Sequence, residues 1–485
     1  MPKKVLSDGT EISQPNRAVD RLMKRLHVRE VPDEEKPAMA VRWLDYYRKD
    51  RRSLTLAMEG CVKCGVCAEQ CHAYLGTKDP NNIPAARADL MRRVYKRYFT
   101  VQGRLFGKLV GAVEMTMDVL EKWYSYYYQC SECRRCGHVC PFGIDTCEVT
   151  MAGREILWAL GFVPELQGAA SAMVFERGNQ GGMTQAAIVD THEFLSDEME
   201  EERGFRIEFP VDKPNSDILY VPSSADYLLN AETLKGAAQF FEYVGANWTI
   251  SSYMLEAGNF GLLTDQRSVQ RELVRRLWWS VADLGIKKVV FGECGHGWRA
   301  WKMYTETLTD YAVAGPGYTY TKVPLVNIHQ EVVALLKAGK LKLDPKNNRL
   351  APVGTYVTLH DPCNYVRADQ LGDVFRYVLY NSVPAVREMY PIKEKNFCCG
   401  GGSAILYDDP EMYNLRIKFF QKKADQVRAS GANHICTPCS ICKAQFYPMV
   451  KEHNLTTEDG KTIMPVNGLI DFLGAALVFK GHRQI

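Results

Sequence analysis

CVKCGVCAEQC at residues 61–71 and CSECRRCGHVCP at residues 130–141 are the two stretches that decide how the first part of this chain folds. Both place four cysteines at the spacing Cys-x2-Cys-x2-Cys-x3-Cys, and proline follows the last cysteine of the second stretch. This spacing is typical of loops that hold [4Fe–4S] cubanes, in which each iron takes one thiolate. The first three cysteines of a run reach one cluster, and the fourth lies too far along the chain, so it ligates the other cluster.

The spacing therefore predicts two cubanes with crossed ligands. One set is Cys61, Cys64, Cys67 and Cys140, and the other is Cys130, Cys133, Cys136 and Cys71. A pair of structural zinc sites is the alternative, but zinc usually takes its cysteines as two separated pairs. We expect His72, which follows Cys71, to be a surface or capping residue, with a hydrogen bond that tunes the cluster as the alternative. Cys147 lies outside both runs and is expected to be an ordinary buried cysteine.

The composition excludes several other classes of protein. The chain has 485 residues, 16 cysteines, 46% hydrophobic residues and a net charge of +3. It is long enough for two or three domains, and its charge gives no general case for nucleic-acid binding. The first residues show no apolar stretch of an export signal, and the short regular cysteine spacings favour metal over disulfides. The most apolar stretches, residues 109–120 and 466–479, contain acidic residues, so we expect no membrane span.

We expect an α + α/β fold in five segments. Residues 1–55 are charged and are expected to form an N-terminal extension or docking arm. Residues 56–165 are expected to form an α-helical ferredoxin domain with two clusters. Residues 166–215 have weak periodicity and are expected to be a linker. Residues 216–350 and 351–485 alternate short apolar runs with helical patterns, which predicts α/β units.

These last two segments resemble each other. DILYVPS at residues 217–223 is similar to YVTLHDPC at residues 356–363, and LEAGN at 255–259 falls where FCCGG falls at 397–401. GECGHG at residues 292–297 falls where TPCSIC falls at 437–442. We therefore expect two related halves with pseudo-twofold symmetry, of which only the second keeps its cysteines.

The second half carries its own set of cysteines. They are Cys363, Cys398, Cys399, Cys436, Cys439 and Cys442, and glycines follow the adjacent pair. Adjacent side chains diverge, so the pair suits a large irregular cluster better than one tetrahedral metal, and the glycines let backbone approach it closely. Cys439 and Cys442 are expected where a strand ends and a helix begins, which lowers a thiol pKa and favours ligation. Zinc and buried free thiols are the alternatives.

These motifs resemble the heterodisulfide reductase family. Cys363, Cys398-Cys399-Gly400 and the later Cys-x2-Cys match its cysteine-rich CCG domain, which in that family binds a non-cubane [4Fe–4S] cluster where disulfides are cleaved. A two-cubane region joined to this domain resembles the fused HdrD subunits and, more closely, the DsrK-type subunits of membrane-bound DsrMKJOP complexes. HdrD chains carry two intact motifs. Here Ser223, Ala257 and Gly258 replace cysteines in the first half, which points to the DsrK type.

The resemblance implies that about five of the six C-terminal cysteines hold the third cluster, with Cys398 and Cys399 also catalytic. The family pattern ends in one Cys-x2-Cys, and this chain offers either Cys436 with Cys439 or Cys439 with Cys442. Both choices stay open. Cys294, the cysteine that remains in the degenerate half, is a candidate for ligation or substrate handling, with a structural remnant as the alternative.

Other residues are weaker candidates by position alone. His296 and His360 are candidate proton donors, although a single histidine is more often structural. Lys443 and Arg367 are candidates for stabilising a thiolate leaving group. One stretch is crowded with basic residues: Arg87, Arg92, Arg93, Lys96, Arg97, Arg104 and Lys108. We expect a solvated helix face there, with an acidic lipid surface or a partner as the alternative.

The expected function follows from the resemblance. It implies a cytoplasmic protein, peripheral on the inner face of the membrane, that receives electrons from a quinol-oxidising cytochrome b of a DsrMKJOP-like complex. Electrons then pass through two cubanes to a non-cubane cluster, where a disulfide or trisulfide of a small DsrC-like protein is reduced. The alternative is a pure electron relay, as in the iron–sulfur subunits of glycolate oxidase and anaerobic glycerol-3-phosphate dehydrogenase. A zinc-stabilised scaffold is the non-redox alternative.

Overall fold

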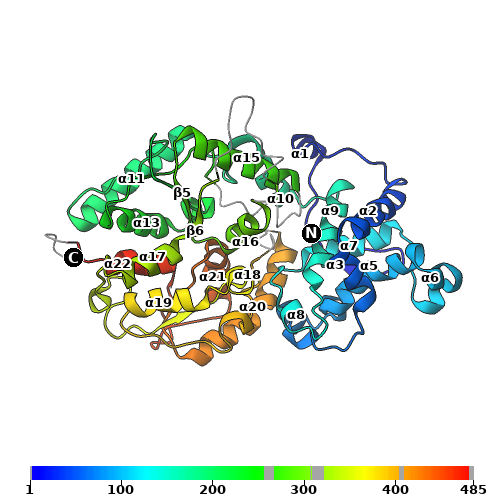
Figure 1. Ribbon diagram of the computed structural model, residues 1–485. Coiled ribbons are helices and arrows are strands. Elements are labelled where there is room, and N and C mark those ends of the chain that lie inside the picture. Colours follow the sequence, from blue (N-terminus) through cyan, green and yellow to red (C-terminus); the bar gives the residue numbers. More distant parts are fainter. Residues whose placement is uncertain (1–2, 256–266, 306, 309–321, 403–408, 480–485) are drawn as a thin grey trace. The chain divides into compact units, whose positions relative to one another are not determined.

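The computed structural model describes residues 3–255, 267–305, 307–308, 322–402 and 409–479 (Figure 1). The chain forms two compact units. The first contains Met1–Ala172 together with Phe397–Lys423, and the second contains Met173–Asn259, Arg267–Asn396 and Ala424–Ile485. The positions 257 and 258, where cysteines are replaced in the degenerate half, lie outside the described residues.

The first unit is mainly helical and has one short antiparallel hairpin, β1 (Lys4–Val5) with β2 (Glu11–Ile12). Its longer helices are α2 (Lys36–Asp50), α3 (Arg52–Gly60), α5 (Pro84–Phe99), α7 (Met117–Tyr128) and α9 (Thr146–Ala159). Its shorter helices are α1 (Asp20–Arg25), α4 (His72–Thr77), α6 (Val101–Phe106) and α8 (Arg135–His138), with 3-10 turns η1 (Ala68–Gln70), η2 (Pro80–Asn82) and η3 (Gly107–Val110).

One apolar core joins the five longer helices. Leu44 and Leu54, on α2 and α3, are buried in it together with Met91, Trp123 and Ile156. The expected N-terminal arm therefore differs from the structure, because the apolar face of the helical pattern near residue 44 is covered by α5, α7 and α9. Burying a leucine or tryptophan side chain stabilises a fold by about 1.5–3 kcal/mol, which is enough to order a segment that looks charged overall.

Phe397–Lys423 packs against the end of the first cysteine run. Helix α20 (Pro410–Ser430) begins in this segment, and Phe419 lies in a small apolar core with Ala73 of α4. A Cβ added at Gly76 would collide with the carbonyl oxygen of Lys418, so α4 and α20 touch backbone to backbone. The adjacent cysteines of the CCG motif are thereby built into the helical unit.

The second unit has two parallel sheets. The first has the strand order β4-β3-β5-β6 and the second has the order β7-β8-β9. The strands are β3 (Ile218–Val221), β4 (Trp248–Thr249), β5 (Lys288–Phe291), β6 (Leu325–Asn327), β7 (Val357–Leu359), β8 (His434–Cys436) and β9 (Val466–Asn467). In register, Leu219 pairs with Val289, and Thr358 pairs with Ile435. Parallel strands separated by helices confirm the expected α/β class.

Helices connect these strands in the same order in both halves. The first half uses α12 (Ser224–Leu229), α13 (Ala231–Tyr243), α15 (Arg267–Asp283), α16 (Gly295–Tyr304) and α17 (Ile328–Lys337). The second half uses α18 (Cys363–Asp369), α19 (Gly372–Ser382), α20, α21 (Ser440–Glu452) and α22 (Leu469–Ala476), with 3-10 turns η5 (Pro345–Asn347) and η6 (Lys393–Lys395).

The packing of these helices shows the pseudo-twofold symmetry. Helix α13 packs on α22, and its counterpart α19 packs on α17. Likewise α16 packs on α18, and the counterpart pair α21 and α12 is also in contact. At the first of these contacts Gly236 and Gly474 allow close approach, since a Cβ added at Gly474 would lie 2.7 Å from the Gly236 Cα. The two related halves therefore share one core.

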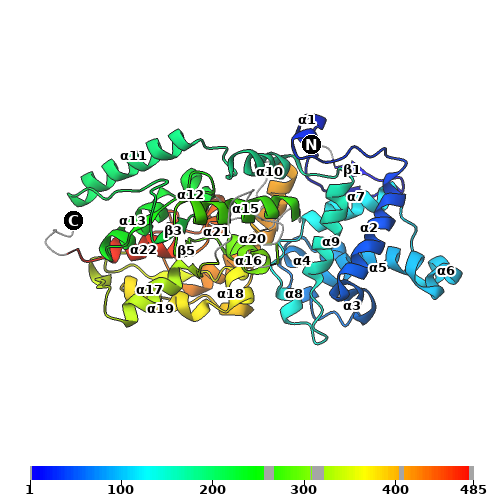
Figure 2. The ribbon, with the colours of Figure 1, turned by 45° about the horizontal axis from the view of Figure 1, so that its top comes forward.

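The expected linker at residues 166–215 contains most of α10 (Glu165–Arg177) and all of α11 (Gln185–Arg203). Thr184 begins α11 by accepting a hydrogen bond from the Ala187 N–H, and Gly204 ends it in the left-handed conformation. Figure 2 shows α11 along the outside of the second unit, beside α13. Arg203 donates hydrogen bonds to Gln239 and to the Gly474 carbonyl, so this segment is an ordered part of the unit.

None of the described helices is long and apolar enough to cross a bilayer. The apolar stretch at residues 109–120 is divided between the end of η3 and the start of α7. The stretch at residues 466–479 contains β9 and the eight-residue helix α22.

His192 on α11 makes the stability of the second unit depend on pH. Burial lowers its pKa to about 4, and its Nε2 lies 2.6 Å from the Tyr227 hydroxyl. Because the unfolded chain binds this proton below about pH 6.5, the free energy of unfolding falls as pH drops from there towards 4, by about 1.4 kcal/mol per unit. Between about pH 7.5 and about pH 5, denaturant unfolding should show that the change in the free energy of unfolding differs by about 2 kcal/mol between His192→Gln and the parent, with the smaller loss in the variant. An equal loss in the variant would contradict this assignment.

Candidate iron–sulfur centres

The structure places Cys140 with the first cysteine run. One cavity is lined by Cys61, Cys64, Cys67 and Cys140, and Cys136 also reaches its wall. Cys64 is exposed, whereas the other three are partly covered. Lys63 and Gly65 have backbone angles in the left-handed region, which bends the loop around this cavity.

A second cavity brings Cys71 to the second run. It is lined by Cys71, Cys130, Cys133 and Cys136, with Cys147 in its wall. Burial raises the pKa of the Cys71 and Cys130 thiols, and the nearby Arg87 guanidinium opposes this shift. Cys147 is buried, as expected from its position outside the runs. Both cavities thus contain the cysteine sets that the crossed spacing predicts, and ligation by these sets stays a prediction.

A buried arginine fixes the second loop. Arg154 on α9 donates hydrogen bonds to the carbonyl oxygens of Tyr127 and Cys130, at 2.6 and 2.7 Å. It also pairs with Glu132 at 3.1 Å, and both side chains are buried. The cysteine spacing does not predict this ion pair, because Arg154 lies on α9, beyond Cys140 and outside both cysteine runs. An arginine among the apolar residues of α9 is the signal that could have found it.

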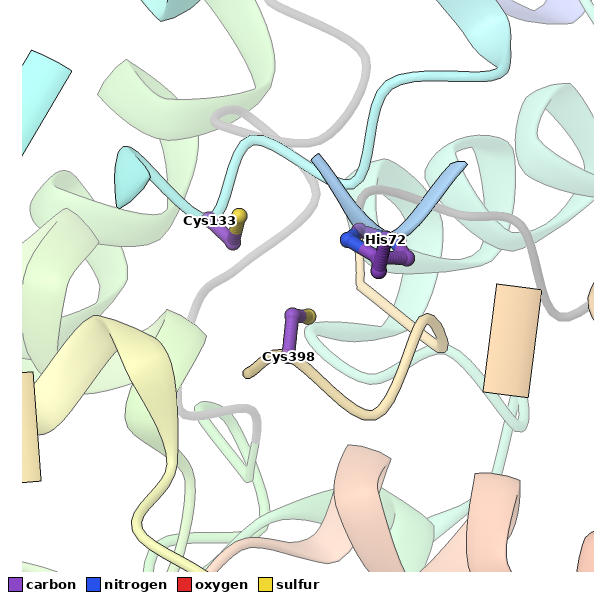
Figure 3. Close-up of side chains that lie close together, drawn as sticks. All are labelled: His72, Cys133 and Cys398. Atoms are coloured by element: carbon purple, nitrogen blue, oxygen red, sulfur yellow. The ribbon is translucent and has the colours of Figure 1, made fainter. Parts of the chain in front are cut away.

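His72 differs from the expected surface residue. It is buried, and its ring packs edge-on against Phe419, 5.8 Å between ring centroids. One of its ring nitrogens and the sulfurs of Cys133 and Cys398 all lie within 4.8 Å of one another (Figure 3). Within the described part of the chain, His72 Nε2 has no hydrogen-bond partner. The first run, the second run and the CCG motif therefore converge on one histidine.

Arg135 joins the same three segments. Its guanidinium donates to Gln70 Oε1 at 2.7 and 3.0 Å and stacks over the Phe397 ring, 3.6 Å from the centroid. Gln70 precedes Cys71, and Phe397 precedes Cys398. Arg135 lies between two cysteines of the second run, and the local sequence does not predict its contacts with Gln70 and Phe397, which are distant along the chain.

Gly400 gives the CCG motif its close backbone approach. Its φ is +84°, and its N–H donates to Cys398 Sγ at 3.3 Å. A Cβ at this position would lie 3.1 Å from Phe419 Cβ and 3.5 Å from the His72 ring. A residue with a side chain would therefore be strained in conformation and crowded against Phe419.

The other candidate cysteines lie in the second unit, where parallel strands end. Cys363 begins α18 after β7, and Cys439 precedes α21 after β8. Cys442 lies in the first turn of α21, whereas Cys436 is the last residue of β8. The carboxyl ends of parallel strands are the usual place for ligand sites in α/β folds.

The thiols of Cys439 and Cys442 lie beside each other and interact, without a disulfide bond between them. Burial alone would raise the pKa of the Cys439 thiol, yet that pKa lies well below its ordinary value because Cys442 and His296 lie beside the sulfur. Burial raises the pKa of Cys436 well above its ordinary value. His360 also lies here, with its ligating nitrogen within 4.8 Å of Cys442 Sγ. The nearness of Cys442 to the Cys439 sulfur agrees with Cys439 and Cys442 as the Cys-x2-Cys, and the choice stays a prediction.

Cys294 stands at the symmetric position of the first half. It precedes α16 as Cys439 precedes α21, and Gly295 N–H donates to Cys439 Sγ at 3.4 Å. A second link joins the two turns, since Ser440 N–H donates to the Glu293 carbonyl at 2.7 Å. The N-termini of both helices thus face this sulfur, which favours its thiolate form. Ser223 holds a structural role instead, as the cap of α12.

The side chains of Lys443 and Arg367, the candidates for stabilising a thiolate leaving group, make contacts within the fold. Lys443 is buried in an ion cluster with Asp226 at 3.0 Å and Glu293 at 3.5 Å. Arg367 donates to the carbonyl oxygens of Glu394 and Asn396. Both side chains hold the fold together around the cysteines, and the leaving-group role is not supported by their contacts.

The basic stretch is likewise divided. Arg87 and Arg92 are buried, and Arg92 donates to the carbonyl oxygens of Met58 and Ala57, both at 3.0 Å. The prediction of a solvated helix face is therefore wrong for Arg87 and Arg92, because their side chains are buried and bind groups in the interior. Arg93, Arg104 and Lys108 are exposed.

Comparison with known proteins identifies the family. Residues 57–144 match the family of 4Fe-4S dicluster domains, and residues 357–447 match the family described as the cysteine-rich domain. An "Hdr-like menaquinol oxidoreductase iron-sulfur subunit 2" of Archaeoglobus fulgidus is 33% identical over all of this chain and 90% of its own length. The chain belongs to the Hdr-like iron–sulfur subunits.

Other relatives of this Hdr-like subunit agree. A protein with the corresponding name in Archaeoglobus profundus is 32% identical over 89% of this chain and 82% of its own length. One chain of the dihydromethanophenazine:CoB–CoM heterodisulfide reductase of Methanosarcina barkeri is 24% identical over 81% of this chain and 90% of its own length. The Hdr-like subunit is thus an iron–sulfur oxidoreductase of the heterodisulfide reductase family, and it works with partner subunits.

The two cavities fit the clusters that this family carries. Each is lined by the four cysteines predicted for its cluster, with Cys136 also in the wall of the first and His72 in the wall of the second. Thiolates of this kind are the ligands that iron–sulfur clusters take. The Hdr-like subunit therefore holds [4Fe–4S] clusters in residues 57–144.

Proposed function

We propose that this Hdr-like subunit carries electrons through two cubanes to a non-cubane [4Fe–4S] cluster, where a disulfide or trisulfide is reduced. The observation that carries the proposal is the meeting of Cys133 and Cys398 at His72 (Figure 3). Cys133 is a predicted ligand of the second cubane, and Cys398 is a predicted ligand of the third cluster. Two sulfurs this close give electrons a short path between the two clusters.

The ligand sets of the proposal follow the cavities and the strand ends. Cys61, Cys64, Cys67 and Cys140 hold the first cubane, and Cys130, Cys133, Cys136 and Cys71 hold the second. Cys363, Cys398, Cys399, Cys439 and Cys442 hold the third cluster. Cys436 is left out of this set because it is the last residue of β8, whereas Cys439 and Cys442 lie together at the start of α21.

Cleavage of a disulfide consumes two electrons and gives one thiolate and, with one proton, one thiol. When bound, the third cluster would supply these two electrons and an iron that can hold a thiolate. The chain's own groups orient and protonate the substrate. His296 lies beside Cys439 and is the proposed donor of that proton. Cys294 lies across from Cys439 at the N-terminus of α16, where the amide groups stabilise negative charge on sulfur.

The partners and the location are part of the proposal. The names of the Archaeoglobus relatives refer to menaquinol, which supports a quinol-oxidising cytochrome b as the electron donor. The first cubane is the proposed receiver, since Cys64 is exposed beside its cavity. The substrate is a small DsrC-like thiol protein, and the chain is peripheral on the inner face of the membrane, held through its partners.

EPR of anaerobically purified, oxidised protein tests this function. We expect a new paramagnetic signal on addition of a thiol peptide that carries the partner's cysteines, because oxidised cubanes of ferredoxin type give none. Cys399→Ser should abolish the signal, and Cys147→Ser should keep it. If the thiol peptide produces no new signal although both cubanes are reduced normally, the reductase proposal is wrong and the pure electron relay is favoured.

A further inference from the structure

An exposed apolar tip projects from the first unit. Val101, Leu105 and Phe106 on α6 and Leu109 on η3 are 73%, 72%, 55% and 89% exposed. Soluble proteins usually scatter such residues singly, and a cluster of large exposed apolar side chains marks an interaction site. Both views show α6 beyond the end of α5, at the outer edge of the helical unit (Figures 1 and 2). We call Val101–Val110 the α6 tip.

The α6 tip is held in shape without burying these side chains. Thr100 caps α6 by accepting the Gly103 N–H at 3.0 Å, and a Cβ at Gly103 would collide with the Lys96 carbonyl oxygen. Arg93 on α5 holds the residues that follow the tip. Its backbone carbonyl accepts a hydrogen bond from the Val113 N–H at 3.1 Å, and its Nε donates to the Gly111 carbonyl oxygen at 3.2 Å. The apolar side chains are therefore presented outward by an ordered backbone and are not left over from the core.

The surroundings of the α6 tip are basic. Arg93, Arg104 and Lys108 are exposed around it, and the sequence from residue 93 to residue 114 contains one acidic residue, Glu114. Glu114 is already paired with Arg97 at 2.7 Å. Cations beside exposed leucine and phenylalanine are the composition of a surface that lies in the interface of an anionic membrane.

We propose that the α6 tip inserts into the headgroup layer of an anionic phospholipid membrane. Leu105, Phe106 and Leu109 enter the boundary of the acyl chains, and Lys108 and Arg104 meet the phosphates. This contact is made by the chain itself and goes beyond attachment through partner subunits. The exposed cations beside these apolar side chains complement the negative surface of an anionic leaflet, and this combination of charge and apolar side chains favours lipid as the occupant.

Sedimentation of the intact protein with vesicles tests the proposal. We expect binding to phosphatidylcholine vesicles that contain phosphatidylglycerol, weaker binding to pure phosphatidylcholine, and loss of the difference at high salt. Leu105→Glu with Leu109→Glu should reduce binding by at least about tenfold, since burying one leucine shifts an equilibrium by that order. Lys108→Glu, which reverses one of the exposed positive charges, should reduce the preference for anionic vesicles.

Matched variants separate the α6 tip from general stickiness. Leu228 and Leu229 are another adjacent exposed pair, and Leu228→Glu with Leu229→Glu should leave vesicle binding unchanged. Iron content and circular dichroism of the tip variants should equal those of the parent, because the replaced side chains are exposed. No binding to either vesicle, or binding that the tip variants do not reduce, would overturn the proposal and assign the α6 tip to a protein partner.

Discussion

The Cys140→Ser variant is expected to lose one whole cluster, about four irons per chain, and the lost cluster is the one of the first run. Cys140 belongs to the second run in sequence, but it lines the cavity of Cys61, Cys64 and Cys67. A serine oxygen is a poor replacement for a soft thiolate ligand of iron. The Cys71→Ser variant is expected to lose the other cubane for the same reason.

Iron removal by a chelator distinguishes the two losses. The first cubane should lose iron quickly because Cys64 is exposed, and the second should lose it slowly because none of the cysteines that line its cavity is exposed. Cys140→Ser should therefore remove the fast phase, and Cys71→Ser should remove the slow phase. Cys147→Ser is the matched control and should keep both phases. A Cys140→Ser variant that lacks the slow phase would show that the ligands are not crossed.

The Lys443→Met variant is expected to destabilise the second unit by about 3–5 kcal/mol, because it leaves buried acids without their cation. Lys443 pairs with Asp226 and Glu293 and donates a hydrogen bond to Thr233, whose hydroxyl also binds Asp471 at 2.6 Å. Burial already raises the pKa of Asp226 to about 7 against the pull of Lys443. A loss of this size is a large share of the stability of a domain.

Denaturant unfolding followed by tryptophan fluorescence measures this effect. Lys451→Met changes an exposed lysine on the same helix and should cost less than about 0.5 kcal/mol. Adding Asp226→Asn to Lys443→Met should recover part of the loss, since one buried charge is removed. Equal stability of Lys443→Met and Lys451→Met would contradict a structural role and return Lys443 to the candidates for the chemistry.

The parts of the fold that the sequence predicted are those with local signals. The cysteine spacing is a local pattern, and it led to both ferredoxin cavities, including the exchange of Cys71 and Cys140. The alternation of short apolar runs with helical patterns led to the two parallel sheets, and the repeat led to their common helix order. The resemblance to the heterodisulfide reductase family, which the cysteine motifs indicated, is confirmed by the Hdr-like relatives.

The parts that the sequence did not predict depend on long-range packing. His72 is buried because Phe419, far away in sequence, covers it, and no pattern around residue 72 announces that contact. The core contacts of Leu44 and Leu54 are likewise made by distant helices. Gly76 is read locally as a helix-weakening residue, yet its role is to let Lys418 come close. Such contacts decide which segments belong together.

Phe397–Lys423 has a consequence for how this protein can be divided. Among the described residues, those up to Ala172 and Phe397–Lys423 belong to the helical unit, and those from Met173 to Asn396 and after Lys423 belong to the second unit. A gene split anywhere between Ala172 and Phe397 would put the adjacent cysteines on the polypeptide that also forms the sheets. The first polypeptide would then lack the segment that covers His72 and Ala73. Neither fragment would be self-sufficient, so separate production should yield inactive pieces, and activity should return only when the two are folded together.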